Sequence, residues 1–246
     1  MLQYSDFLIK ICQKEEYVQD ILAGNIYMNE LKWFNSIPDS FRGDRYDGHR
    51  YHKIVDNEPV FLCLEVKGIN PSSIKLPLPP KSVIAQSFIG ADKIPLFCAV
   101  QLDENIVESI SPNEYKFKKS VIEHMEQFGN HVVILSKREL MAKMEEYANK
   151  NNVKIHAENV RYVNEKSSIP RTDSWEEQIK EFLFVKTVSP DRAYTLQNEW
   201  RMAITYPQVI SDNENHKIIH IGELEYAMTL PSIDWLKEGT LKVEVK

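Results

Sequence analysis

The sequence holds only three cysteines, Cys12, Cys63 and Cys98, and none stands in a C-x-x-C pair. Their wide spacing argues against a disulfide framework or a zinc site and predicts small buried hydrophobic side chains. The N-terminal residues lack the charged-then-apolar layout of a signal peptide, and no apolar run approaches the roughly 18 residues that span a bilayer. We therefore expect a cytoplasmic protein with no membrane partner.

Recognisable nucleotide, protease and hydrolase motifs are also missing. The chain contains no P-loop, G-x-G-x-x-G, H-E-x-x-H or G-x-S-x-G pattern. His49 and His52, like His216 and His220, are not accompanied by ligands at metal spacing, so we expect no metal. The net charge of −6 and pI of 5.7 argue against a protein that coats nucleic acid by bulk charge, although a local basic patch stays open.

What is present is an ordinary globular balance, with 43% hydrophobic and 27% charged residues, which predicts a packed core. Short strands and helices interleave without repeats and without the regular alternation of a doubly wound sheet. We expect a single α+β domain over 1–246 with a split mixed or antiparallel sheet surrounded by short helices. The expected strands are 7–12, 25–29, 61–66, 83–88, 96–101, 131–135, 159–163, 197–205, 217–221 and 241–245.

The expected helices have clear start and stop signals. Gly24 should end a helix over 14–23, because glycine readily takes positive φ. Ser136 with Glu139 and Ser174 with Glu177 form capping boxes that open two further helices. A fourth helix is expected within 112–128, where Phe117, Val121, Met125 and Phe128 share one side. Residues 35–59 are polar and turn-rich, which predicts a long functional loop or a partly ordered segment.

The segment from Leu196 to Ile204 is the strongest candidate for chemistry. Strand alternation puts Leu196, Trp200, Met202 and Ile204 on one face, with Asn198 as a polar exception. The opposite face carries Gln197, Glu199 and Arg201 in a row. A fixed carboxylate can accept hydrogen bonds from a ribose hydroxyl and stabilise an oxocarbenium-like state. The alternative is a solvated strand face with a simple Glu–Arg pair.

A second candidate combines Tyr27 and Asn29 with Arg42, Asp44 and Arg45, which are nearby in sequence. An aromatic ring can stack on a flat ring, and arginines can clamp a pyrophosphate through two parallel hydrogen bonds. The alternative is a turn-rich surface loop whose charges are merely solvated.

Three segments, in this order, resemble a bacterial and phage family of uncharacterised proteins that is associated with the ADP-ribosyltransferase-like fold. The segments are YVQDILAGNIYMNELKWF (17–34) leading to Arg-Gly-Asp at 42–44, then 131–163, and finally Phe-Val-Lys at 184–186 followed by Gln-x-Glu-Trp-Arg at 197–201. They cover about half of the chain.

The resemblance implies roles for particular residues. Glu199 would be the catalytic carboxylate that bonds the nicotinamide ribose, and Gln197 would orient the substrate. Tyr27 would be the ring partner of nicotinamide. Family members place an arginine or histidine on the first strand to hold NAD, whereas here the first strand offers only Lys10, so Lys10 or an arginine of 42–45 would have to substitute, or NAD is not bound.

The resemblance therefore implies an NAD-dependent ADP-ribosyltransferase that modifies an unknown protein or nucleic-acid acceptor, as a toxin, a defence protein or a phage host-takeover factor. Tyr27, Asn29, Arg42, Arg45 and Arg201 would bind NAD as the substrate. The alternative is a catalytically inactive module of the same fold that acts by protein–protein interaction. The absence of an arginine on the first strand favours this alternative.

Overall fold

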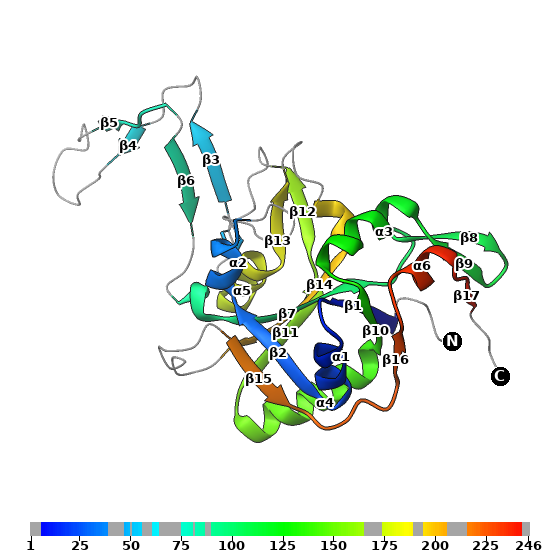
Figure 1. Cartoon of the computed structure of the whole chain (residues 1–246). Coiled ribbons are helices and arrows are strands. Elements are labelled where there is room, and N and C mark those ends of the chain that lie inside the picture. The colour runs from blue at the N-terminus through cyan, green and yellow to red at the C-terminus, as the bar shows by residue number, and fades with distance from the viewer. Residues whose placement is uncertain are drawn as a thin grey trace.

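The computed structural model describes residues 6–38, 47–49, 51–55, 61–63, 75–80, 82–86, 90–164, 174–188, 194–205 and 216–242. Its centre is an eight-stranded sheet in which every pair of neighbouring strands is antiparallel. Short helices pack on both faces of this sheet (Figure 1). The strands are β1 (Phe7–Cys12), β2 (Asn25–Glu30), β7 (Pro95–Gln101), β10 (His131–Ser136), β11 (Lys154–Asn159), β14 (Glu199–Thr205), β15 (His216–His220) and β16 (Ala227–Leu230).

The sheet forks at strand β7. One edge of β7 pairs with β14 along most of its length, from Leu96 to Val100. On its other edge, β2 pairs with Pro95 and Leu96, whereas β1 pairs with Val100 and Gln101. Strand β2 continues to β15, and β1 continues to β10 and β16. The sheet therefore divides into two branches that separate at the middle of β7.

Lys10 lies at this fork. Its Nζ donates a 2.6 Å hydrogen bond to the backbone oxygen of Cys98 and sits 4.9 Å from the centre of the Phe97 ring. Because none of the described strands pairs with Cys98 on this edge of β7, a side chain supplies the donor that a strand would otherwise provide. The only cation of β1 thus bonds the backbone of the sheet.

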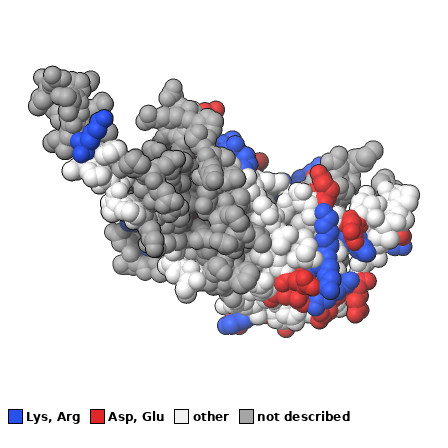
Figure 2. Space-filling view, turned by 90° about the horizontal axis from the view of Figure 1, so that it is seen from above, with Lys and Arg blue, Asp and Glu red and all other residues white. Residues whose placement is uncertain are grey.

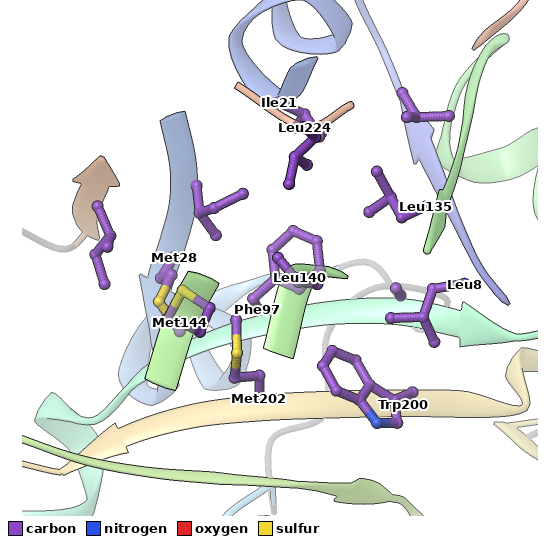
Figure 3. Close-up of a cluster of buried hydrophobic side chains, with 14 of the residues drawn as sticks. Leu8, Ile21, Met28, Phe97, Leu135, Leu140, Met144, Trp200, Met202 and Leu224 are labelled. Atoms are coloured by element: carbon purple, nitrogen blue, oxygen red, sulfur yellow. The ribbon is translucent and has the colours of Figure 1, made fainter. Parts of the chain in front are cut away.

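The first face of the sheet carries the largest hydrophobic core. Helices α1 (Glu15–Leu22) and α4 (Lys137–Asn151) cover this face. Their apolar side chains meet residues of β1, β2, β7, β10 and β14, among them Phe97, Trp200 and Met202 (Figure 3). These three side chains are at most 1% exposed, so their burial stabilises the fold by about 2–3 kcal/mol for each side chain.

The second face of the sheet is covered in two separate parts. Near β1 and β10, helices α3 (Lys119–Met125) and α6 (Asp234–Glu238) pack around Ile9, Val132 and Ile134. Near the start of β7, helices α2 (Leu31–Ser36) and α5 (Trp175–Leu183) pack around Leu96 and Ala203. Between these two apolar clusters, the same face of β14 carries the buried polar side chains of Glu199 and Arg201.

Smaller β-ribbons complete the described chain. Strands β12 (Arg161–Asn164) and β13 (Val185–Val188) form a parallel pair, and β8 (Val107–Ser111), β9 (Glu114–Phe117) and β17 (Leu241–Lys242) form a three-stranded sheet. An arm projects from the body (Figure 1). It consists of the antiparallel pair β3 (Tyr51–Val55) and β6 (Ser82–Gln86) and, between them in the chain, the antiparallel pair β4 (Phe61–Cys63) and β5 (Lys75–Pro77). Short 3-10 turns occupy Ala91–Lys93, Glu126–Phe128 and Tyr194–Gln197.

The predicted α+β class is confirmed in its coarse form, with a mostly antiparallel sheet and short helices. Gly24 ends α1 with φ of 78° as expected. The Ser136 and Ser174 hydroxyls accept hydrogen bonds from the amides of Glu139 and Glu177, at 3.3 and 3.4 Å. The Glu139 carboxylate, however, does not complete its capping box: it accepts from the backbone amides of residues 225 and 226, and so ties α4 to the start of β16.

Three sequence predictions of secondary structure are corrected. The expected loop at 35–59 contains strand β3, whose β-forming residues Tyr51, Ile54 and Val55 pair with β6. Phe117 ends strand β9 instead of beginning a helix. The expected strand at 159–163 is two strands, because Val160 separates β11 from β12 and its backbone amide donates to the Glu199 oxygen. Parts of the predictions for 35–59, 61–66, 83–88 and 241–245 lie outside the described residues.

Within the described ranges, no helix combines the length and apolar character needed to cross a membrane.

Gly24 and Gly222 offer a matched pair of substitutions. Both have positive φ, 78° and 79°, but a methyl group on Gly24 would collide with the backbone of Gly222, whereas one on Gly222 would meet nothing within 4 Å. We expect Gly222→Ala to cost about 1–2 kcal/mol, the cost of positive φ alone. Gly24→Ala should cost at least twice as much, because backbone atoms must also shift. Urea unfolding would measure the free energy of unfolding of both variants. Equal losses of stability would contradict the close approach of the Gly24 and Gly222 backbones.

Candidate functional site

The polar segment of β14 begins with a turn. The prediction of a strand from position 197 is wrong by two residues: Gln197 ends a 3-10 turn, and Asn198 takes the left-handed conformation with φ of 40°. The Asn198 side chain donates a hydrogen bond of 2.7 Å to the backbone oxygen of Gln101. The backbone oxygen of Asn198 in turn accepts a hydrogen bond of 2.9 Å from the backbone N–H of Gln101. Asn198 is therefore polar because it joins the ends of β7 and β14, and asparagine tolerates this backbone conformation.

Arg201 is the centre of a buried ion-pair network. Its Nε donates to Glu199 Oε1 at 2.7 Å, and its two terminal nitrogens donate to both Asp47 oxygens at 2.7 and 2.5 Å. The remaining donors reach the Leu183 backbone oxygen at 2.8 Å and Glu199 Oε2 at 3.4 Å. The five N–H groups of the guanidinium are thus all used. Leu183 is the last residue of α5, so Arg201 also caps that helix.

Lys186, on β13, closes the network from the other side. Its Nζ lies 2.7 Å from Glu199 Oε2, 3.3 Å from Gln197 Oε1 and 3.8 Å from Asp47 Oδ2. Tyr162, the β12 residue that pairs with Lys186, accepts the backbone amide of Glu199 through its hydroxyl at 3.1 Å. The β12–β13 ribbon therefore covers both the side chain and the backbone of Glu199.

Among the described residues, the network is electrically balanced, and its charged groups are buried. Asp47, Glu199, Lys186 and Arg201 are 2%, 7%, 5% and 1% exposed, and their two negative charges match the two positive charges. Buried charges persist only when they are paired and hydrogen-bonded, and each of these groups meets that condition. The alternative of a solvated strand face is therefore wrong in one respect: the Glu–Arg pair exists, but water is excluded from it.

The surrounding charges fix the ionisation states. Burial alone would raise the pKa of the Glu199 carboxyl, but Arg201 and Lys186 outweigh burial and hold this pKa far below its ordinary range. Burial alone would lower the pKa of the Lys186 ammonium, but Glu199 and Asp47 raise it instead. Burial raises the pKa of the Tyr162 hydroxyl, and the Glu199 charge raises it further. Glu199 is therefore an anion and Lys186 a cation across the physiological range.

Two other side chains border the network. Cys98, the β7 partner of Arg201, is a free thiol whose pKa is raised to about 12, first by burial and then by the Glu199 charge. A thiol with this pKa stays protonated and is a poor nucleophile. The buried His124, on α3, has a lowered pKa because of burial and because of the nearby Lys186 charge.

The residues predicted to bind NAD are divided by the structure. Gln197, Glu199 and Arg201 meet in the network. Tyr27 and Asn29 lie on β2, where the Tyr27 ring is 47% exposed and stacks on His216 with 4.8 Å between ring centres.

Asn29 pairs with Leu96 of β7, which pairs with Ala203 of β14, so strand alternation places Tyr27, Asn29 and Glu199 on the same face of the sheet. However, β2 pairs with β7 only at Asn29 and Glu30, and Tyr27 lies on the part of β2 before this pairing begins, on the other side of the fork from Glu199. Arg42 and Arg45 lie outside the described residues.

Sequence reasoning missed three members of the network. Asp47 belongs to the Asp-Gly pair that follows Arg45, a pattern typical of tight turns, and Gly48 has φ of 77° and packs against Leu31. Lys186 lies in the Phe-Val-Lys segment of the family resemblance, and Tyr162 lies near the end of its 131–163 segment. A lone lysine in the short strand β13 is a signal of a buried polar contact, whereas β12 also carries Arg161 and Asn164 and gives no such signal. The partners of both residues are distant in sequence.

Comparisons of the chain with family models, with curated proteins and with solved structures gave no match. Among the described residues, no group of three or more His, Cys, Asp or Glu side chains is arranged to hold a metal ion. The geometry of the network is therefore the basis for any functional argument.

We expect Arg201→Met to lower the free energy of unfolding by about 3–5 kcal/mol, because it would leave two buried carboxylates without their main partner. Lys242→Met is the control: Lys242 makes a 2.7 Å ion pair with Glu114 at the surface, and its loss should change stability little. Urea denaturation of both variants would measure the difference. Similar losses in the two variants would contradict a buried network.

The lowered pKa of Glu199 predicts a particular dependence of stability on pH. A carboxyl with a depressed folded-state pKa stabilises the protein above its unfolded-state pKa of about 4.3, and this stabilisation is lost as the pH falls toward the folded-state value. Below about pH 4.3, this one group should contribute a slope of up to roughly 1.4 kcal/mol per pH unit. Glu199→Gln should therefore have a shallower slope than the wild type, although it is less stable. Parallel slopes in denaturant melts at several pH values would exclude this contribution.

Proposed function

We propose that the protein is an NAD-dependent ADP-ribosyltransferase in which Glu199 acts on the nicotinamide ribose and Gln197 orients the substrate. The observation that carries the proposal is that Gln197 Oε1 and Glu199 Oε2 both contact one atom, Lys186 Nζ. The two side chains of the Gln-x-Glu motif therefore converge on one point, although Gln197 lies outside the strand. An amide oxygen and a carboxylate that converge are suited to accept hydrogen bonds from a sugar.

The architecture around Glu199 supports the proposal. The α+β fold has a mostly antiparallel sheet that forks at β7, and β14 lies directly beside β7. Tyr27 presents a half-exposed ring on the same face of the sheet as Glu199, but on the branch that β2 and β15 form. In the proposal, Tyr27 and Asn29 contact the dinucleotide, and Arg42 and Arg45 stay predicted ligands of its pyrophosphate.

The reaction makes defined demands on Glu199. The bond between ribose C1′ and the nicotinamide nitrogen breaks, and nicotinamide leaves with the electron pair. The acceptor nucleophile then bonds to C1′, and its proton is released to water. A carboxylate that stays ionised stabilises the positive charge that develops on the ribose. Arg201 has all of its donors engaged within the protein, so its role in the proposal is to position Glu199 and not to hold NAD.

The acceptor in this proposal is a protein or a nucleic acid, which suits a toxin, a defence protein or a phage host-takeover factor. On the face shown in Figure 2, described Lys and Arg side chains stand beside Asp and Glu side chains. Charges of both signs are thus interspersed over the described part of that face, so recognition of an acceptor there would rest on local contacts and not on a field of one sign.

A second candidate is a catalytically inactive module of the same fold that acts by protein–protein interaction. The specific observation that favours it is the occupation of both Glu199 oxygens, at 2.7 Å each, by Arg201 and Lys186. A carboxylate that is 7% exposed and bonded on both oxygens supports the sheet and the β12–β13 ribbon without any ligand. In that case the network only supports the fold, and Lys10 has no role beyond its hydrogen bond to the Cys98 backbone oxygen at the fork.

Incubation with labelled NAD and a cell lysate distinguishes the two candidates. The wild type should consume NAD and label an acceptor, whereas Glu199→Gln should lose at least about 100-fold in rate, because the amide cannot stabilise positive charge. Glu145→Gln, an exposed position on α4, is the matched control and should keep the activity. A wild type that neither binds nor consumes NAD would eliminate the transferase and leave the inactive module.

A further inference from the structure

The two cations that neutralise Glu199 are held very differently. Arg201 uses five donors on Asp47, Glu199 and the Leu183 carbonyl, so moving it would break the contacts of a helix end and of two carboxylates. Lys186 meets Glu199 and Gln197 with a single nitrogen, at 2.7 and 3.3 Å, and its distance to Asp47 is 3.8 Å. A lysine ammonium is a point charge on a flexible four-carbon stem. Because these three contacts of Lys186 pass through one nitrogen, a single movement of its side chain would break them together, while Arg201 would keep Glu199 in place.

Displacement of Lys186 would release two acceptors together. Gln197 Oε1 and Glu199 Oε2 face the same point, and Glu199 would also need a new positive charge near Oε2, because a buried carboxylate is costly without one. A ligand that takes this place must therefore supply hydroxyl donors and a nearby cation. Oxidised NAD has both, since its nicotinamide ring is positively charged and is attached to a ribose with two adjacent hydroxyls. Reduced NADH has the same hydroxyls but a neutral ring.

We propose that Lys186 is an intramolecular substitute for the substrate: its ammonium occupies the Gln197–Glu199 site until the ribose and the positively charged nicotinamide ring of oxidised NAD displace it. This inference rests on the proposed function, and it adds that the resting site is closed and that it selects the oxidised cofactor over the reduced one. It also explains how a carboxylate with both oxygens bonded becomes available to a ligand. Lys186 is in this sense a positioning residue that sets the affinity of the site.

The experiment compares Lys186→Met with Lys180→Met. Methionine has nearly the length of lysine but no charge, and Lys180 is a lysine of α5 that makes a 2.6 Å ion pair with Glu158 at the surface. Binding of NAD and of NADH to each protein is measured by calorimetry and by the rise in melting temperature. Lys186→Met should melt lower than the wild type without ligand, bind NAD at least 10-fold more tightly, and gain no comparable affinity for NADH. Lys180→Met should match the wild type.

A second variant keeps the inference falsifiable if Lys186→Met does not fold. Lys186→Arg retains the cation and adds donors, so it should close the site more firmly and weaken NAD binding. Unchanged or weaker NAD binding by folded Lys186→Met, or tighter binding by Lys186→Arg, would overturn the inference. If the wild type consumes NAD while Lys186→Met gains no affinity, only the role of Lys186 fails. If neither protein binds or consumes NAD, the proposed function fails as well.

Discussion

The structure depends on the requirement that Arg201, which is buried on β14, be neutralised. Its guanidinium gathers Asp47 from a distant turn, Glu199 from its own strand and the carbonyl at the end of α5. Lys186 then balances the second carboxylate and brings the β12–β13 ribbon over β14. An ion-pair network of this kind adds little net stability over an apolar core, but any incomplete version of it is costly. The network therefore selects one arrangement of segments that are far apart in sequence.

The same network separates two apolar clusters on the second face of the sheet. Ile9, Val132 and their neighbours pack with α3 and α6, whereas Leu96 and Ala203 pack with α2 and α5. The fork at β7 lies between these regions, where Lys10 bonds the backbone of Cys98. Lys10 thus satisfies a backbone oxygen that strand pairing leaves without a donor, and Arg201 and Lys186 neutralise the buried charge of Glu199. The Gln197–Glu199 site, which Lys186 closes, thus lies beside the fork of the sheet, and this is where the proposal places the positively charged nicotinamide riboside of NAD.

Much of the secondary structure could be predicted from local patterns. The alternation of Phe7–Cys12 and the positive φ required at Gly24 depend only on neighbouring residues, and both are confirmed. The helix expected within 112–128 exists as α3, but it begins only at Lys119, because Phe117 belongs to strand β9, which pairs with the neighbouring β8 and with the distant β17. Asn198 was recognised as an exception to alternation, but its role as the link to Gln101 depends on the neighbouring strand.

The sequence alone determined an α+β class, most strand positions, and the grouping of Gln197, Glu199 and Arg201 as the polar residues of one segment. These features follow from periodicity over a few residues. Only the tertiary structure decided that Glu199 is buried, that Asp47 and Lys186 are its companions, and that Tyr27 stands across a fork from it. Alternation specifies which side of a strand a residue occupies, whereas the packing of remote segments determines whether that side meets water or a buried counter-charge.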